Sequence, residues 1–347
     1  MGQQIGTQSL RFAEAPFILE SGSIVGTKES EGPLGHKFDV TGADDRFGCD
    51  KWEVAESTLQ KEALTIAMGK SGVQASDIRY LYAGDLLGQT IATSFGLMDF
   101  EIPMFGVYGA CSTAGESMGL AAMAVAGGFA DLAAAVTSSH FASAEKQFRF
   151  PLEYANQRPL CATWTVTGSG AFLLCTKAFL KKQKKRPEGH EIRLTGITTG
   201  KIVDYGVRDA MNMGAAMAPA AADCIAAHLT DFGRAPTYYD KIITGDLGEV
   251  GRKLLIELLD QRGIDVGACH TDCGLEIYDN KRQGTGSGGS GCGCSAVTLS
   301  AHFLPQLRRG ELKRILFVPT GALLSKISFN EGQNVPGIAH GVVLEAE

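Results

Sequence analysis

The stretch Tyr108-Gly109-Ala110-Cys111-Ser112-Thr113-Ala114-Gly115-Glu116-Ser117 decides the fold of this chain. The apolar segment 103–107 before it is typical of a strand. The small and apolar residues 118–126 after it predict a buried helix. Cys111 is therefore expected where a strand turns into a helix.

The position of Cys111 allows three interpretations. A thiol at a helix start feels the positive end of the helix dipole, which favours the thiolate and would suit a nucleophile. Ser112 and Thr113 are good capping residues, and the free N–H groups of that first turn would form a cradle for an anion. The third interpretation is a small cysteine buried in the core.

Length and composition indicate a globular protein. The chain has 347 residues, enough for one large domain or two fused halves, and 44% of them are apolar. A net charge of -6 argues against nucleic acid as the main partner. Nine irregularly spaced cysteines without a secretory leader indicate a reducing compartment. The apolar run 120–136 is broken by glycines and Asp131, so we expect no membrane-spanning helix.

The second half of the chain repeats the first. Residues 80–88 (YLYAGDLLG) and 241–248 (KIITGDLG) each form an apolar strand that ends in Gly-Asp-Leu. Residues 111–137 and 294–320 each run from Cys-Ser through a small-residue helix to an apolar strand that ends at a threonine. This order predicts a duplicated α/β fold with pseudo-two-fold symmetry, in which the two Cys-Ser helix starts face each other. The longer spacing in the second half predicts an insertion near 269–283.

A basic run marks the predicted boundary between the halves. Residues 181–186 read Lys-Lys-Gln-Lys-Lys-Arg. Such runs are usually solvated linkers, and the alternative is contact with an anionic surface. We expect an N-terminal half at 1–185, which carries Cys111, and a C-terminal half at 186–347.

The cysteine turn and the duplicated order of elements resemble a known fold family. A cysteine at a strand-to-helix turn in a duplicated α/β chain is similar to the thiolase-fold condensing enzymes, close to the type-three ketoacyl-ACP synthases. Over nearly its whole length the chain resembles the stage V sporulation protein AD family of spore-forming bacteria. The stretches that carry this resemblance are GACSTAGESMGLA, TVTGSGAFLL, IITGDLGEVG and GTGSGGSGCGCSAV.

The resemblance implies both a fold and a function. The fold would be thiolase-like, with α/β/α/β/α layers, and usually a homodimer. The function would be binding of dipicolinic acid (pyridine-2,6-dicarboxylate), free or with calcium, for uptake into the developing spore and release in germination. It further implies peripheral attachment at the inner spore membrane through other membrane proteins of the same uptake system. No cofactor is implied.

Departures from the enzyme pattern favour a binding protein. Condensing enzymes need a cysteine together with His and Asn, or with two His. Here the place of the first partner reads Ile243-Thr244-Gly245-Asp246 and contains no His, and the loop 284–294 contains neither His nor Asn. The alternative is a Cys-dependent acyltransferase or condensing enzyme that uses Cys111 with a displaced base such as His140.

The predicted ligand site gathers residues from both halves. The Gly-rich loop 284–291 lacks the ending of a phosphate loop and is interpreted as a nest of N–H groups that suits an anion. The residues expected to bind ligand are Cys111, Ser112, His140, Thr163, Trp164, Asp246, Gly289, Ser290, Thr320 and Gly321. An indole at Trp164 would stack on a flat ring, and a core position is the alternative.

The sequence also offers three cations that could pair with the ligand and one cysteine-histidine cluster. Arg158, Arg208 and Lys326 are candidates to pair with the carboxylates, with solvated surface positions as the alternative. The cluster 269–273, together with the cysteines of the Gly-rich loop, matches no common zinc spacing. We therefore expect no metal site and no catalytic residue.

Overall fold

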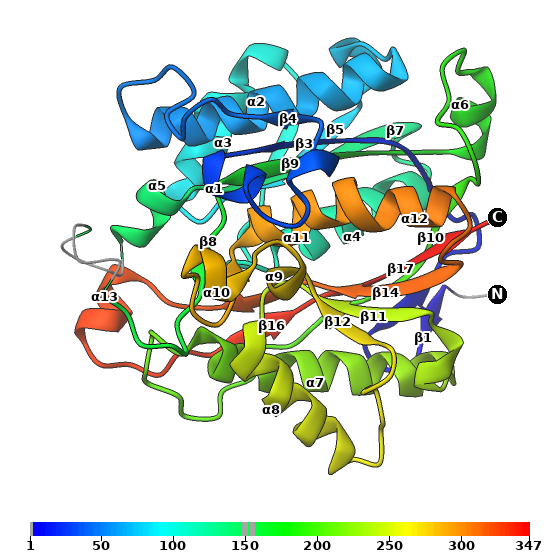
Figure 1. Cartoon of the computed structure of the whole chain (residues 1–347). Coiled ribbons are helices and arrows are strands. Elements are labelled where there is room, and N and C mark those ends of the chain that lie inside the picture. The colour runs from blue at the N-terminus through cyan, green and yellow to red at the C-terminus, as the bar shows by residue number, and fades with distance from the viewer. Residues whose placement is uncertain (1–2, 148–151, 153–156) are drawn as a thin grey trace.

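The main strands form one continuous sheet, whose two halves are stacked as an upper and a lower sheet between three layers of helices (Figure 1). The structure is a computed structural model that describes residues 3–147, 152 and 157–347. In Figure 1, α2 covers the upper sheet, α4, α11 and α12 lie between the sheets, and α7 and α8 cover the lower sheet. This arrangement confirms the predicted α/β/α/β/α layering.

The strand order is mirrored about the middle of the chain. The strands follow one another as β12-β11-β14-β17-β10-β3-β9-β7-β5-β6. Only one residue pair, Arg193 with Phe17, joins β10 to β3, so the path consists of two five-stranded units that meet there. Each strand of one unit has its counterpart at the same distance from the junction in the other, as the duplicated sequence predicts.

The main elements occur in the same order in both halves. The first half contains β3 (Phe17–Val25), α2 (Trp52–Ser71), β5 (Tyr80–Gly84), α3 (Ile91–Leu97), β6 (Met104–Gly106), α4 (Thr113–Ala126), β7 (Leu132–Ser139) and β9 (Gly168–Cys175). The second half contains β10 (Ile192–Thr198), α7 (Met213–Phe232), β11 (Lys241–Thr244), α8 (Gly248–Asp260), β12 (His270–Asp272), α11 (Cys292–Thr298), β14 (Arg314–Val318) and β17 (Gly341–Ala346).

Shorter elements complete the chain. They are β1 (Gln4–Ile5), β2 (Ser9–Arg11), α1 (Thr27–Ser30), β4 (Val40–Thr41), α5 (Phe141–Glu145), β8 (Trp164–Thr165), α6 (Lys177–Lys182), α9 (Cys273–Glu276), α10 (Asn280–Gln283), β13 (Gly289–Ser290), the π-helix η7 (Leu299–Phe303), α12 (Leu304–Arg308), β15 (Thr320–Ala322), α13 (Lys326–Asn330) and β16 (Gly337–Ala339). The helices α9 and α10 lie between β12 and α11, where the longer spacing predicts an insertion.

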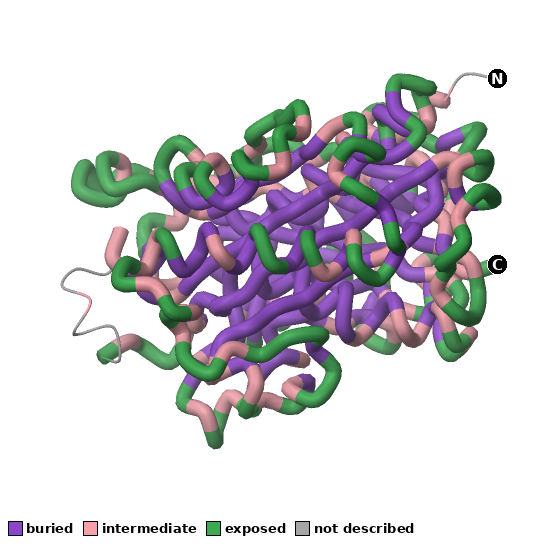
Figure 2. The backbone as a smooth tube through the Cα atoms, turned by 90° about the horizontal axis from the view of Figure 1, so that it is seen from above, coloured by how far each residue is buried: buried purple, intermediate pink, exposed green. Residues whose placement is uncertain are grey.

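Small residues allow the middle layer to pack tightly. A Cβ atom added at Gly170 of β9 would lie 2.7 Å from the Cβ of Ala296 in α11, and one added at Gly293 would lie 2.4 Å from the carbonyl oxygen of Gly168. The helix backbone therefore rests almost directly on the strand. Figure 2 shows the result, with buried backbone through the centre of the molecule and exposed segments at its edges.

The basic run begins inside a helix. Lys181 and Lys182 form the last turn of α6, where cations interact favourably with the helix dipole. The rest of the run leads to β10, so the predicted boundary after residue 185 lies between α6 and β10. Over the part of the chain that the structure describes, we find no helix long and apolar enough to cross a membrane.

Candidate functional site

Cys111 lies in a strained turn between β6 and α4. The preceding residue, Ala110, has a φ of +50°, in the left-handed region that a non-glycine residue rarely adopts. Such strain is typical of functional sites, where surrounding structure holds it in place. Gly321 of β15 packs against the turn so closely that an added Cβ would lie 2.3 Å from the carbonyl oxygen of Gly109.

The hydroxyls after Cys111 do not cap the helix as predicted. The Oγ of Ser112 donates to the carbonyl oxygen of Gly109 at 2.6 Å, and the Oγ1 of Thr113 donates to that of Ala110 at 2.6 Å. The backbone N–H groups of Ser112 and Thr113 donate to the same two carbonyls. The prediction of an open anion cradle at this helix start is wrong in its donors, because the turn itself uses them.

Asp246 occupies the centre of the site. Its buried carboxyl accepts hydrogen bonds from the Gly291 N–H at 2.9 Å, the Ser290 hydroxyl at 3.1 Å and the Thr320 hydroxyl at 2.7 Å. The Cys111 thiol lies beside this carboxyl, and the two groups shift each other's pKa. In the Gly-rich loop, the N–H of Gly291 therefore donates to a carboxyl of the protein itself.

The surroundings of Cys111 favour the thiol over the thiolate. Burial raises the pKa of Cys111 well above its usual value, and the nearby Asp246 and Cys292 raise it further. A helix dipole contributes only about 0.3–1 kcal/mol in favour of the anion at an exposed site. Desolvation and the neighbouring carboxyl outweigh that contribution. The expectation of a thiolate at this position is therefore wrong.

A narrow cavity opens beside the thiol. It encloses about 60 Å³ and draws its walls from both halves of the chain. The polar side chains that line it are Tyr108, Cys111, Gln147, Thr165, Ser290, Ser325 and Lys326, and the apolar ones are Leu86, Ala110, Ala144, Met213, Ala322 and Leu324. Burial raises the pKa of Tyr108 to about 12, so its phenol stays protonated and can donate.

The structure brings together most of the predicted ligand residues. Cys111 and Ser290 line the cavity, and Asp246 and Thr320 lie directly behind them. Gly289 supports the wall from behind, since an added Cβ would lie 2.8 Å from Cγ2 of Ile277. Ser112 and Gly321 belong to the packed backbone around the Cys111 turn.

His140 does not reach the cavity. Its Nδ1 accepts the N–H of Ala142 at 3.1 Å as the N-cap of α5, so its proton is on Nε2, which donates to the carbonyl oxygen of Asp45 at 2.7 Å. Its ring lies 5.4 Å from that of Trp52. Burial lowers the pKa of His140, which keeps the imidazole neutral in this capping position.

Trp164 and Thr163 also lie outside the cavity lining. Successive residues of a strand point to opposite sides, and in β8 it is Thr165 that faces the cavity. Trp164 instead stacks on Phe141, with ring centroids 4.2 Å apart. The carbonyl oxygen of Thr163 accepts a hydrogen bond from Arg158 at 2.7 Å. The sequence analysis missed Thr165, although alternation from Trp164 would have indicated it.

The three candidate cations have different positions. Lys326 lines the cavity. Arg158 lies over the Trp164 ring at 4.4 Å and pairs with the buried Glu145 at 3.7 Å. Arg208 donates to the side-chain oxygen of Asn334 at the surface. Only Lys326 is therefore placed to meet a ligand beside Cys111.

The cysteine and histidine cluster at 269–273 is structural. The Nε2 of His270 lies 3.0 Å from the Oγ1 of Thr244, which in turn donates to Asp272 at 2.6 Å. Within residues 3–147, 152 and 157–347 there is no group of three or more His, Cys, Asp or Glu side chains that could hold a metal ion.

Comparison with known proteins identifies the family. The model of the stage V sporulation protein AD family matches residues 6–345. The chain belongs to this family. Stage V sporulation protein AD of Bacillus subtilis (strain 168) is 43% identical over 340 residues, which cover 98% of this chain and 97% of that protein.

Members of this family share a fold with condensing enzymes. The tetronic acid condensing enzyme AbyA1 matches with a TM-score of 0.57 and 16% identity, over 95% of this chain and 99% of that one. OleA of Xanthomonas campestris matches with a TM-score of 0.54 and 15% identity, over 99% and 100% of the two chains. The 3-oxoacyl-[acyl-carrier-protein] synthase III of Aquifex aeolicus matches with a TM-score of 0.54 and 10% identity, over 95% and 99%. At these identities the likeness shows a thiolase-like fold alone.

Proposed function

We propose that this chain binds dipicolinic acid, free or as its calcium complex, in the cavity beside Cys111. In this proposal binding serves uptake of the ligand into the developing spore and its release in germination. The observation that carries the proposal is the buried Asp246 carboxyl next to the buried Cys111 thiol, in a cavity whose described lining contains no imidazole. The family assignment supports the biological setting.

The chemistry of the cavity suits binding better than acyl transfer. Attack on an acyl group needs a thiolate or a base that removes the thiol proton. Asp246 lies where a base would be required, but burial raises the pKa of Cys111 well above its usual value. His140 is held elsewhere as a helix cap. A protonated thiol can still shape a pocket and donate a hydrogen bond.

The ligand's carboxylates would meet side-chain donors at the mouth of the cavity. Ser290 and Thr165 already donate to Asp246 and Glu145. The side chains left to donate to the ligand's carboxylates are therefore those of Lys326, Gln147 and Tyr108. The apolar side chains of the lining would pack against the pyridine ring. A calcium complex of the dianion is neutral, which lowers the cost of removing charge from water.

Binding requires the cavity to widen. Its volume of about 60 Å³ is well below the roughly 300–1,000 Å³ of most small-molecule pockets. Residues 324–326 belong to the segment that joins β15 to β16, just before and at the start of α13, and Ser325 and Lys326 are exposed. This segment is the part of the wall that can move outward with the least loss of buried contact.

Assembly and attachment form part of the same proposal. Strand β6 is an exposed sheet edge that presents Met104 and Phe105, and an unpaired edge of this kind readily pairs with another strand. We propose a homodimer through this edge, and peripheral attachment to the inner spore membrane through other membrane proteins of the uptake system. Sedimentation that shows dimers for the natural chain and monomers for Phe105→Arg would support the dimer, and a natural chain that is monomeric at micromolar concentration would contradict it.

A binding titration tests the function. The purified chain is titrated with dipicolinate, with and without calcium, and with benzoate and an acyl-CoA as comparisons. We expect saturable binding of dipicolinate and weak or no binding of benzoate, which has only one carboxylate. Mass spectrometry after incubation with acyl-CoA is the counter-test. A stable acyl adduct at Cys111 without dipicolinate binding would establish the acyltransferase alternative.

A further inference from the structure

A second pocket lies far from Cys111, where β3, α2 and α12 meet. It has a volume of about 280 Å³, and Lys70, Arg308 and Arg309 contribute the positive charges of its lining. In Figure 1, α6 and the end of α12 lie at the right of the molecule, whereas α13, which begins with Lys326, lies at the left. A molecule bound at this pocket would leave the Cys111 cavity open.

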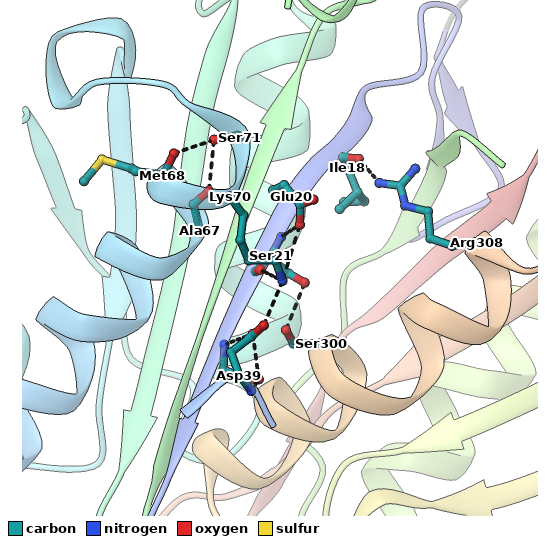
Figure 3. Close-up of polar contacts among 11 residues, drawn as sticks. Ile18, Glu20, Ser21, Asp39, Ala67, Met68, Lys70, Ser71, Ser300 and Arg308 are labelled. Atoms are coloured by element: carbon teal, nitrogen blue, oxygen red, sulfur yellow. Dashed lines mark hydrogen bonds and ion pairs between the residues drawn. The ribbon is translucent and has the colours of Figure 1, made fainter. Parts of the chain in front are cut away.

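Arg308 is a half-buried cation without a carboxylate partner. Its guanidinium donates to the backbone carbonyl oxygen of Ile18 at 2.6 Å (Figure 3). It also donates to the carbonyl oxygen of His190 at 2.8 Å. Among the described residues it forms no ion pair within 4.0 Å, and the other N–H groups of its fork have no protein acceptor there. Glu20 and Glu191 act on this charge from a longer distance. A desolvated charge is costly unless it is paired closely, and a bound anion would supply a direct partner.

Local irregularities of the backbone shape this pocket. The pairing of β3 with β9 shifts between Ile18 and Glu20, which frees the Ile18 carbonyl for Arg308. On the opposite wall, the π-helix η7 carries Ser300, whose hydroxyl donates to that of Ser21 at 2.9 Å. Short π-helical segments occur frequently at functional sites. Two hydroxyls therefore line the pocket along with the cations.

Lys70 approaches the pocket from the end of α2. Its Nζ donates to the Ser21 carbonyl at 2.8 Å and to Asp39 at 3.0 Å, and Glu20 lies 3.6 Å away (Figure 3). Glu20 also accepts the Ser21 N–H, so both carboxylates next to Lys70 already have partners. Glu188 is a further acid of the lining and is exposed to solvent.

The basic run of the linker continues this pocket along the surface. Pro187, which follows the run directly, lines the pocket, and the Lys185 side chain lies over Gly72 at the end of α2. The lysines of the run are exposed, and Arg186 is the member that pairs with an acid, Glu191, at 3.9 Å. We call this surface the basic face: Lys70, Lys181, Lys182, Lys184, Lys185, Arg186, Arg308 and Arg309.

We propose that the basic face binds the phosphate groups of anionic phospholipids, with one headgroup in the Arg308 pocket and the lysine run against the membrane surface. Clusters of four or more Lys and Arg near a bilayer are attracted by its negative surface potential, at about 1 kcal/mol for each residue. This contact adds to the peripheral attachment proposed above but does not depend on dipicolinate binding. It would be weak and salt-sensitive, because the face is basic but carries little exposed apolar surface.

A membrane fits the face better than a nucleic acid. A single pocket of about 280 Å³ admits one headgroup, whereas a polymer needs a groove along which successive phosphates can lie. The aromatic side chains on which unpaired bases would stack are absent from the pocket lining. Free phosphate has the same chemistry as a headgroup, so the test must separate the two sources.

Vesicle co-sedimentation with the full chain tests the proposal. Vesicles of phosphatidylglycerol and phosphatidylcholine in equal parts are compared with phosphatidylcholine alone, at low and at physiological salt. We expect binding to the anionic vesicles that is about tenfold tighter than to neutral ones and that weakens with salt. Lys181, Lys182, Lys184 and Lys185, all changed to Ser, should weaken it at least about tenfold.

A matched variant controls for net charge. Lys51, Lys201, Lys253 and Lys281 are also exposed and lie outside the basic face, so their change to Ser should alter vesicle binding less than about twofold. Arg308→Gln, checked for an unchanged melting temperature, should weaken binding as well. If Arg308→Gln lowers the melting temperature, the four-lysine variant decides the outcome, because its residues are fully solvated.

Three outcomes would overturn the proposal. One is equal loss of binding in the two four-lysine variants. Another is that the chain binds inorganic phosphate at millimolar concentration but does not bind anionic vesicles. That result would indicate a site for free phosphate. The third is tighter retention on duplex DNA than on the vesicles. Dipicolinate binding by the same variants should be unchanged, because none of the substitutions lies in the Cys111 cavity. The two proposals can therefore fail independently.

Discussion

The Cys111 thiol lies beside the Asp246 carboxyl across the junction of the two halves, and the charge of Asp246 raises the pKa of Cys111. Both groups are buried, and burial raises the pKa of each. The carboxyl is held by three donors from the Gly-rich loop and β15. The position of a nucleophile is thus retained on a condensing-enzyme fold, while the group opposite it keeps the thiol protonated.

Substitutions of Cys111 separate shape from chemistry. Cys111→Ser keeps the size and one donor, so we expect dipicolinate binding to stay within about threefold of the natural chain. Cys111→Trp fills the cavity and should abolish binding while thermal unfolding remains cooperative. Calorimetric titration measures dipicolinate binding by both variants, and a thermal melt checks the cooperativity of unfolding. A Cys111→Trp variant that folds and still binds normally would place the ligand site elsewhere.

Asp246→Asn should make Cys111 more reactive. The change removes the carboxyl that helps to raise the pKa of the thiol, so the thiolate fraction at pH 8 should increase. The amide also offers one acceptor oxygen in place of two, which leaves a buried donor unpaired at a cost of about 1–3 kcal/mol. Iodoacetamide labelling followed by mass spectrometry should show faster modification at Cys111. Slower or equal labelling would mean that Asp246 does not control the thiol.

Two glycines of the loop before α11 should respond differently to alanine. Gly291 has a φ of +104° and no room beside Ser139, since an added Cβ would lie 2.5 Å from its Oγ. Gly289 lacks a left-handed φ and would meet side-chain atoms of Ile277 and Cys294. We expect Gly291→Ala to cost about 1–3 kcal/mol more in unfolding free energy than Gly289→Ala. Chemical denaturation checks this order, and equal losses would contradict the role of the backbone at Gly291.

The sequence predicts the scaffold better than the site, for a physical reason. The strand at 17–25 and the repeated Gly-Asp-Leu segments follow from local periodicity, and the mirrored sheet follows from the repeat. The cavity walls come from contacts between distant segments, such as the pairing of β13 with β8. That pairing decides that Thr165, and not Trp164, faces Cys111. Likewise, the N–H of Gly291 donates to the carboxyl of Asp246, a contact between distant segments that the local sequence pattern cannot show.

Glu56 of α2 is a fully buried acid. Burial raises its pKa to about 8, the nearby Asp85 raises it as well, and hydrogen bonds from Ser138 and Ser143 oppose the shift. A carboxyl whose folded pKa exceeds its unfolded value stabilises the fold below the unfolded pKa of about 4.5, and this contribution is lost as pH rises to about 8. Wild-type stability should therefore decline across this window by up to about 1.4 kcal/mol for each pH unit from this group.

Glu56→Gln removes this proton linkage with little change in shape. Relative to the natural chain, the variant should gain stability steadily between pH 5 and pH 8, because only the natural chain must keep a proton on a buried acid or bury its charge. Urea unfolding at several pH values measures the difference, which isolates Glu56 from the buried histidines that titrate in both proteins. Since Glu56 does not line the cavity, dipicolinate affinity should be unchanged at pH 6. A stability difference that is constant with pH would show that Glu56 is ionised in the folded protein.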